Sequence, residues 1–395
     1  MTRLILRPAR AHRIRGGHPW IYRSDVAALE GPWDPDEAVT VCDPDGRVLG
    51  RGFYNPRPQI VCRLVTRHDE PVDDALLRRR LEAAARLRRT RPPPDGDAGR
   101  IAFSDADALP GVILDRYGGT LVLQALTRAM AGRARRLAEL AAEVTGAAAV
   151  YRRGDPTAAA IEGFDDAEGW LLGTDRTVVE IREGPCRFTV DLAGGQKTGF
   201  YLDQRENRAH VAGHAAGRAV LDAFCYTGAF ATWARRQGAA SVVAVDSSPD
   251  ATRQAAAHLA ANAPADGGGP FEVVTANAFD ALRGLERAGR QFDLVILDPP
   301  PFTRRRTAID AALRGYKEIN LRALRCLRPG GLLATFSCSH HVGPGLFEEV
   351  CRAATEDVGR PVRLVETYGQ ARDHPVLLAV PETRYLTGLL LEAVE

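Results

Sequence analysis

The chain has 395 residues, of which 45% are hydrophobic and 26% charged, and its formal net charge at pH 7 is +2. This composition is ordinary for a soluble protein of two or three domains. No apolar run approaches the roughly 20 residues of a membrane span, and the first residues show no signal-peptide core. These features argue against a membrane or secreted protein, and we expect a cytoplasmic location.

The cysteines and lysines are sparse. The seven cysteines form no CxxC pair and no Cys/His cluster, so the sequence predicts no metal site and mostly buried thiols. Lysine occurs only as Lys197 and Lys317, and all other members of the lysine-plus-arginine total are arginines. Such usage is typical of a GC-rich genome. Two lysines that persist under that pressure are candidates for function, although they are also consistent with ordinary structural positions.

Residues 1–70 predict a small β-barrel, with strands at 38–42, 48–54 and 59–65 and a turn at Asp43–Gly46. The segment before these strands mixes arginines with glycines and aromatic residues. This mixture suits RNA, because guanidinium groups bind phosphates and rings stack on unpaired bases. The alternative is a solvated basic face. The candidate RNA-binding residues here are Arg13, Arg15, His18 and Trp20.

Residues 71–182 predict a small α/β middle domain. A helix over 73–91 carries leucines on one side and an arginine run typical of a solvated face, and a proline run from Pro92 ends it. Further predicted elements are strands near 108–119, 120–125, 148–152 and 178–182 and a helix over 128–144.

Residues 183–395 contain the stretch that organises the chain. A strand over 219–224, a turn at Tyr226–Gly228, a helix over 230–237 and a strand ending on Asp246 make a nucleotide-binding half-site. The glycine lets the backbone approach a ligand, and the carboxylate can bind ribose hydroxyls. Because the turn lacks the three glycines of a pyrophosphate cradle, it predicts a nucleoside without phosphates, and S-adenosylmethionine fits.

A hairpin near Arg187–Asp191 leads into a polar, glycine-rich loop that carries Lys197, and a helix is predicted over 202–214. The loop immediately precedes the first strand of the half-site. We therefore expect it to fold over the cofactor and Lys197 to meet the methionine carboxylate.

Later strands end on further polar residues. The third strand, from Phe271, ends near Asn277, which could bond adenine. The next strand, over 292–298, ends on Asp298 before three prolines, and a later strand ends on Cys338. Because ligands of parallel sheets lie at the carboxyl ends of strands, these residues predict one site, with Cys338 two strands further along the sheet from Asn277. The predicted cofactor-binding residues are Lys197, Thr198, Gly199, Phe200, Asp203, Arg205, Asp222, Phe224, Tyr226, Thr227, Gly228, Asp246, Ser247, Asn277 and Asp298.

Cys338 is placed for nucleophilic catalysis on a pyrimidine. C5 of cytosine becomes nucleophilic when a thiolate adds to C6, and it can then attack a sulfonium methyl group. A carboxyl at Asp298 could bond N3 or N4 and stabilise the charge that develops. The alternative for Cys338 is a structural cysteine at a strand end. Cys225 in the turn is expected to be buried, and His340 and His341 are either bases or loop surface.

Several motifs in chain order carry a resemblance to a known family. They are Arg15–Tyr22, Leu109–Tyr117, Gly195–Arg205, Leu221–Gly228, Asp298–Pro300, Arg314–Asn320, Phe336–Ser339 and Asp373–Pro375. The chain resembles bacterial 23S ribosomal RNA 5-methylcytosine methyltransferases, which have a PUA domain, a small α/β middle domain and a class I Rossmann methyltransferase domain. The resemblance implies S-adenosylmethionine as methyl donor, 23S rRNA as substrate, Cys338 as nucleophile and a homodimer. Lys317, in the Arg314–Asn320 motif, is a further candidate for RNA contact.

No residue is assigned to removing the C5 proton, because many RNA 5-methylcytosine enzymes carry a second cysteine where this chain has Pro300.

Two other functions stay open at this point. Asp298–Phe302 also resembles the acidic-Pro-Pro-aromatic motif of enzymes that methylate exocyclic amines without a cysteine. The other alternative is a non-catalytic RNA-binding protein that keeps the fold as a scaffold.

Overall fold

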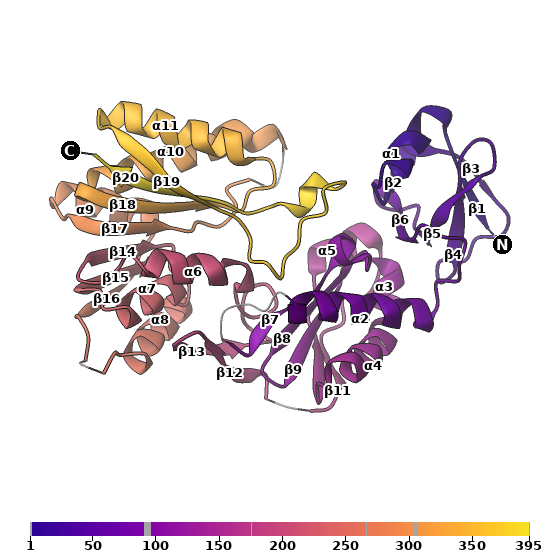
Figure 1. The fold of residues 1–395 in the computed structure, drawn as a ribbon, viewed down its shortest axis with the longest axis horizontal. Helices are drawn as coiled ribbons and strands as arrows, with labels where there is room; N and C mark the ends of the chain where they lie inside the picture. The colour runs from indigo at the N-terminus through magenta and orange to yellow at the C-terminus, as the bar shows by residue number, and fades with distance from the viewer. Residues whose placement is uncertain (1, 91–95, 175, 266, 304–305, 395) are drawn as a thin grey trace. The chain divides into compact units, whose positions relative to one another are not determined.

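The computed structural model describes residues 2–90, 96–174, 176–265, 267–303 and 306–394, which form two compact units (Figure 1). Unit 1 comprises Met1–Ile181, Val190–Leu202 and Arg372–Thr383. Unit 2 comprises Arg182–Thr189, Asp203–Ala371 and Arg384–Glu395. Two segments that follow residue 182 in the sequence thus belong to unit 1. The domain boundaries at 70 and 182 stay a prediction.

The first part of unit 1 is a six-stranded sheet in the order β2-β6-β5-β4-β1-β3. Its elements are β1 (Arg3–Leu6), α1 (Ala11–Arg15), β2 (Trp20–Tyr22), β3 (Val26–Glu30), β4 (Ala38–Cys42), β5 (Val48–Tyr54) and β6 (Ile60–Thr66). The last three strands match the prediction within one residue, and the predicted Asp43–Gly46 turn closes with Gly46 N donating to Asp43 O at 3.0 Å. Leu4, Ile14 and Ile21 fill the core of this sheet.

The second part of unit 1 is a five-stranded sheet in the order β11-β10-β9-β8-β7, with helices packed on one face. Its strands are β7 (Ala98–Phe103), β8 (Val112–Tyr117), β9 (Thr120–Ala125), β10 (Ala149–Arg152) and β11 (Gly169–Leu172). Its helices are α2 (Asp74–Thr90), α3 (Arg128–Gly132), α4 (Ala134–Thr145) and α5 (Pro156–Glu162). The proline run from Pro92 lies outside the described residues.

Two expectations for this sheet are wrong. The predicted helix over 128–144 is divided at Arg133, after Gly132, a residue of low helix propensity. The predicted strand near 178–182 is not part of the sheet: among the described strands, β12 (Val178–Glu183) pairs only with β13 (Cys186–Asp191), in a hairpin. The edge strand next to β10 is β11, where Trp170 packs edge-on against Tyr151 with 5.1 Å between the ring centres.

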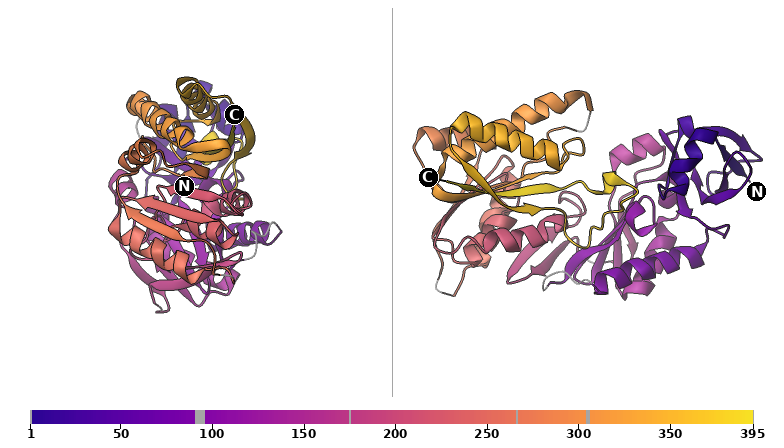
Figure 2. Two further views of the ribbon diagram at one scale, coloured as in Figure 1. Left: turned by 90° about the vertical axis from the view of Figure 1, so that its left-hand side faces the viewer. Right: turned by 45° about the horizontal axis from the view of Figure 1, so that its top comes forward.

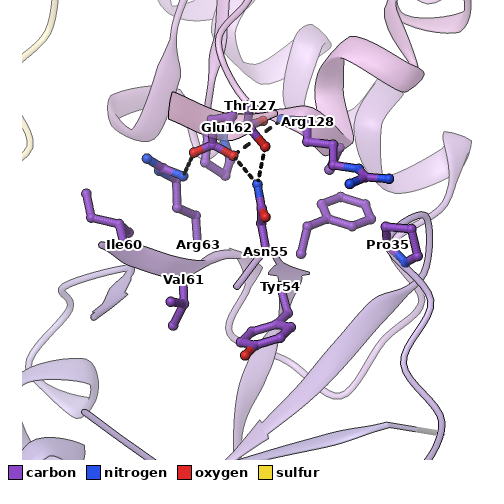
Figure 3. Close-up of a pocket in the computed structure, with 12 residues that line it drawn as sticks. Pro35, Tyr54, Asn55, Ile60, Val61, Arg63, Thr127, Arg128 and Glu162 are labelled. Atoms are coloured by element: carbon purple, nitrogen blue, oxygen red, sulfur yellow. Dashed lines mark hydrogen bonds and ion pairs between the residues drawn. The ribbon is translucent and has the colours of Figure 1, made fainter. Parts of the chain in front are cut away.

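The two sheets of unit 1 share a hydrophobic core, because Phe53 and Val65 pack in one cluster with Leu76 and Leu81 of α2. A buried carboxylate also joins them (Figure 3). Glu162 accepts hydrogen bonds from Asn55 Nδ2 at 2.9 Å and from Arg63 Nη1 at 2.8 Å. These partners satisfy the buried charge, so the small pocket that these residues line is a structural junction.

Unit 2 is built on a seven-stranded sheet in the order β16-β15-β14-β17-β18-β20-β19. The first five strands pair in parallel, and β20 pairs antiparallel with both neighbours. The strands are β14 (Ala219–Ala223), β15 (Ser241–Asp246), β16 (Phe271–Thr275), β17 (Phe292–Leu297), β18 (Leu327–Ser337), β19 (Val362–Tyr368) and β20 (Thr387–Ala393). The helices are α6 (Arg205–Ala212), α7 (Ala229–Arg236), α8 (Pro249–Ala261), α9 (Ala278–Arg287), α10 (Ile309–Arg325) and α11 (Pro344–Val358).

Helices cover both faces of this sheet (Figures 1 and 2). Leu221 of β14 faces the core formed with α9, α10 and α11, whereas its neighbour Val220 faces the core formed with α6, α7 and α8. This alternation follows from the two-residue period of a strand. It explains the continuous apolar runs of the central strands.

The chain reverses direction across the sheet at β14, which lies between β15 and β17. In open α/β sheets, ligands bind at such a switch point. The reversal also corrects one expectation: Asn277 follows β16 and Cys338 follows β18, so three strands lie between their strands in the sheet. Among the described residues, no helix has the length and apolarity to cross a bilayer.

Candidate active site

The turn after β14 has an unusual backbone. Phe224, Tyr226 and Gly228 all have positive φ, at 64°, 47° and 74°. Non-glycine residues seldom adopt this conformation, and such strained positions cluster at functional sites. A Cβ on Gly228 would lie 2.8 Å from Ala255 Cβ of α8, so close helix packing requires glycine there. The turn therefore holds a fixed conformation at the switch point of the sheet.

Asp246 at the end of β15 is fixed by two backbone groups. Its Oδ2 accepts from Tyr226 N at 2.8 Å, and its Oδ1 accepts from Ser248 N at 2.9 Å. Asp246 is partly exposed and Ser247 is exposed. A carboxylate held in one orientation with remaining lone pairs is suited to two ribose hydroxyls, as the sequence predicts.

Asp222 is buried, unlike Asp246. Its Oδ2 accepts from Ala231 N at the start of α7, at 2.9 Å. Burial, reinforced by the charges of Asp298 and Asp246, raises the pKa of Asp222 to about 8. Among the described residues, Asp222 Oδ1 and Thr227 Oγ1 are buried without a hydrogen-bond partner. Buried polar atoms normally have partners, so these two atoms are consistent with a ligand that supplies them.

Asn277 caps α9, because its Oδ1 accepts from Phe279 N at 2.9 Å. Its side chain is exposed. Three aromatic rings lie in the same region. The centre of the Phe279 ring is 6.0 Å from that of Phe224 and 5.7 Å from that of Phe302. Sequence reasoning selected Phe224 but missed Phe279. Phe279 lies in α9, the helix that follows Asn277, and not in the strand before it. These rings provide an apolar surface beside the polar strand ends.

The two predicted catalytic residues are brought together. Cys338 Sγ lies 3.7 Å from the carbonyl oxygen of Pro299, the residue after Asp298. Cys338 is partly exposed, whereas the other six cysteines, including Cys225, are buried. Asp298 Oδ1 accepts from Gln204 Nε2 at 2.9 Å. Gln204 was not selected from the sequence, although it lies within the Gly195–Arg205 motif.

A buried tyrosine links the loops that carry Cys338 and Asp298. Tyr316 of α10 hydrogen-bonds through its hydroxyl to Ser339 Oγ at 2.9 Å and to Ser337 Oγ at 3.0 Å. Ser339 Oγ also accepts from Phe302 N at 3.2 Å. Both residues that flank Cys338 are thus fixed by one phenol, and one of them holds the loop after Asp298. Sequence reasoning missed Tyr316, whose only signal is its place in the Arg314–Asn320 motif.

Asp203 and Arg205, two predicted cofactor residues, are both buried in unit 2. Asp203 Oδ2 accepts from Tyr385 Oη at 2.7 Å, and Asp203 O accepts from Ala371 N at 2.9 Å. These bonds join the start of α6 to the segment before β20. The carboxylate therefore has at least a structural role.

The predicted loop around Lys197 belongs to unit 1. Thr198 is fully buried, and its Oγ1 donates to Asp115 Oδ2 at 2.6 Å and lies 2.8 Å from Tyr117 Oη. The same phenol accepts from Phe200 N at 3.2 Å. The loop is thus anchored through Thr198 and Phe200, and Gly199 has φ 133°. Lys197 is exposed, with Nζ 4.3 Å from the centre of the Tyr201 ring.

The predicted RNA-binding residues are engaged within the protein. Arg13 pairs with Asp25 at 2.6 Å, and Arg15 pairs with Asp43. His18 is buried, accepts from Trp20 N at 3.1 Å, and has its pKa lowered mainly by that burial. Lys317 pairs with Asp357 at 2.8 Å. These pairs reduce the charge available to phosphates, and the RNA role of these residues stays a prediction.

Two family models match the chain. One, described as a PUA-like domain, matches residues 4–67; the other, described as an S-adenosylmethionine-dependent methyltransferase, matches residues 106–375. The chain belongs to this methyltransferase family. The expected fold, a PUA-like domain with a Rossmann-like methyltransferase, is thereby confirmed, as is S-adenosylmethionine as the cofactor.

Relatives of this methyltransferase match along its whole length. It is 38% identical to ribosomal RNA large subunit methyltransferase I of Alteromonas mediterranea, across 100% of this chain and 99% of that one. It is 37% identical to the protein of the same name from Salmonella arizonae, across 98% and 96%. Two solved methyltransferase structures share its fold, one complexed with S-adenosylhomocysteine (SAH; TM-score 0.85, 20% identity) and one from Streptococcus mutans (TM-score 0.83, 19% identity). Each of the two covers 99% of this chain and is itself covered completely.

The residues of the methyltransferase fit its cofactor. The strained turn, the fixed Asp246 carboxylate and the unpartnered Asp222 Oδ1 and Thr227 Oγ1 are the features that a nucleoside site needs. Membership in a methyltransferase family does not support the alternative of a non-catalytic RNA-binding scaffold. Among the described residues, no group of three or more His, Cys, Asp or Glu side chains could hold a metal ion.

Proposed function

We propose that this methyltransferase modifies C5 of a cytosine in 23S rRNA and that Cys338 forms the covalent bond to the base. The relatives named ribosomal RNA large subunit methyltransferase I support the RNA class. The observation that carries the C5 assignment is the placement of Cys338, the partly exposed thiol, 3.7 Å from the carbonyl that follows Asp298. We also expect a cytoplasmic location, as the sequence predicts, and a homodimer, as the family resemblance implies.

The chemistry assigned to the chain begins at the sulfur. Cys338 Sγ, as the thiolate, forms a bond to C6, and the electron pair of the C5–C6 double bond makes C5 nucleophilic. Asp298 bonds N3 or N4 of the base and stabilises the charge that develops there. Bound S-adenosylmethionine supplies the electrophilic methyl group. When a base or water removes the C5 proton, the C5–C6 double bond re-forms and the Sγ–C6 bond breaks, which returns Cys338.

The site positions these groups through hydrogen bonds of its own. Gln204 orients Asp298, and Tyr316 fixes both residues beside Cys338. A reacting group held in one geometry lowers the entropic part of the barrier. The rings of Phe224, Phe279 and Phe302 provide an apolar surface beside the strand ends.

A second candidate is methylation of an exocyclic amine. The Asp298–Phe302 segment favours it, because an acidic side chain and a prolyl carbonyl can both accept from an amine. The Pro299 carbonyl lies beside Cys338, but that mechanism needs no thiol. Nucleoside mass spectrometry of 23S rRNA from cells with and without the protein separates the candidates. Loss of one 5-methylcytosine supports the first, and loss of an N-methylated base supports the second.

A further inference from the structure

A groove of about 710 Å³ runs through unit 1 between the N-terminal sheet and helix α2. Gly17 and Pro19, from the Arg15–Tyr22 motif, line one side together with Arg67 after β6. Arg80 and Arg86 of α2 line the other side. This motif therefore faces a cavity, although its own arginine, Arg15, is paired with Asp43.

The charge in this groove is mainly positive. No carboxylate within the described part of the chain forms an ion pair with Arg67, Arg80 or Arg86. Their guanidinium contacts are to backbone carbonyls, Arg67 to Ile14 at 2.7 Å and Arg80 to Val65 at 3.4 Å, which leave the charges uncompensated. Arg86 is exposed.

Two carboxyl groups also line the groove, fewer than the three arginines. Asp107 pairs with Arg88, and both side chains are buried at 4% and 6% exposure. Burial raises the pKa of Asp105, which favours its neutral form relative to an ordinary aspartate. The three arginines therefore dominate the field that a ligand meets.

The shape favours a single strand. The volume lies within the range of about 300–1,000 Å³ that is usual for a small ligand, so the groove is too small to enclose a duplex. Val65, Leu87 and Leu377 give the groove an apolar component. Apolar surface flanked by guanidinium groups matches a ribose-phosphate chain whose bases are unpaired.

We propose that this groove binds a single-stranded segment of the RNA substrate, with Arg67, Arg80 and Arg86 on its phosphates. The inference rests on the proposed function, in that it takes RNA to be the substrate. In this proposal, the arginines on either side of the groove bind the RNA near the N-terminal sheet, in place of Arg13 and Arg15.

The test is the salt dependence of RNA binding. The full-length protein and the variants Arg67→Gln, Arg80→Gln and Arg86→Gln are titrated by fluorescence anisotropy against a labelled single-stranded RNA oligonucleotide at several salt concentrations. Each lost phosphate contact should weaken binding several-fold and reduce the slope of log K against log salt by about 0.7. Arg86→Lys should retain most of the affinity, because it keeps the charge.

Arg89→Gln is the matched control, since Arg89 is an exposed arginine of α2 that does not line the groove. It should bind RNA almost as the parent does. Thermal unfolding and S-adenosylmethionine calorimetry confirm that each variant is folded. Groove variants that keep the parental affinity and salt slope would overturn the inference, as would an equal loss in Arg89→Gln.

The outcome for the groove is distinguishable from the outcome for the proposed function. If the groove variants lose RNA affinity while the parent transfers no methyl group to rRNA, the groove stands and the proposed function fails. If the parent methylates rRNA and the groove variants bind and methylate it equally well, the groove fails and the proposed function stands.

Discussion

The hydroxyl of Tyr316 lies 2.9 Å from Ser339 Oγ, although 23 residues separate them in the chain. The same hydroxyl accepts from Ser337 at 3.0 Å, so both neighbours of Cys338 are held from one point on α10. Tyr316 is itself fully buried, and its ring packs 4.5 Å from that of Phe302. The orientation of the thiol at the end of β18 therefore depends on a helix that precedes the strand.

Replacing Tyr316 with phenylalanine should slow methyl transfer while substrate binding persists. The variant keeps the ring packing but removes the hydrogen bonds to both serines, so the Cys338 loop loses its fixed position. We expect kcat to fall about tenfold, equivalent to about 1.4 kcal/mol in the barrier, with KM values close to the parental ones. Steady-state kinetics on rRNA measure both constants. Tyr151→Phe, which removes a hydroxyl bonded to Glu168 in unit 1, is the control and should keep parental kcat.

The Tyr316 contact also shows where prediction from sequence ends. The segment from β14 through α7 to β15 was predicted within one or two residues, because apolar runs and a glycine turn are local signals. The pairs Tyr316–Ser339 and Gln204–Asp298 could not be predicted, since they join residues far apart in sequence. Likewise, β11 is a four-residue edge strand with too little periodicity to detect.

Asp246→Asn should weaken binding of S-adenosylmethionine. An asparagine has one acceptor oxygen, so it cannot accept from both Tyr226 N and Ser248 N and also bind two ribose hydroxyls. We expect an affinity loss of about 100-fold, or about 2.7 kcal/mol, in isothermal titration calorimetry. Asp250→Asn, at an exposed ion pair with Arg253, is the matched control. Equal affinity of Asp246→Asn and the parent would show that the carboxylate does not hold the ribose.

Lys197→Ala should also weaken cofactor binding, by roughly five- to tenfold, if its ammonium meets the methionine carboxylate as the sequence predicts. Thr198 and Phe200 anchor the loop independently, so the substitution should leave the fold intact. Lys197→Arg keeps the charge and should recover most of the affinity in the same calorimetric measurement. An alanine variant with parental affinity would refute the role of Lys197.

The buried Asp222 predicts a pH dependence of stability. Its pKa of about 8 in the folded protein exceeds the value of about 3.9 in an unfolded chain, so the folded state binds the proton more tightly. The contribution of this group to the free energy of unfolding therefore falls as pH rises from about 4 to about 8 and is constant above that. Asp222→Asn mimics the neutral form and lacks this pH-dependent contribution to the free energy of unfolding.

Urea denaturation of both proteins across this pH range measures the effect. The stability of the parent relative to Asp222→Asn should decline steadily up to about pH 8 and then level off. A difference that does not vary with pH would show that Asp222 is ionised in the folded protein.

The covalent role of Cys338 is tested most directly with RNA that contains 5-fluorocytosine at the modified position. Fluorine cannot leave as the C5 proton does, so the enzyme should stay bonded to C6 after methyl transfer. With S-adenosylmethionine present, intact-protein mass spectrometry should show an RNA adduct for the parent and for Cys225→Ala, and none for Cys338→Ala. A Cys338→Ala variant that still forms 5-methylcytosine in normal rRNA, or an adduct mapped to another residue, would contradict the account.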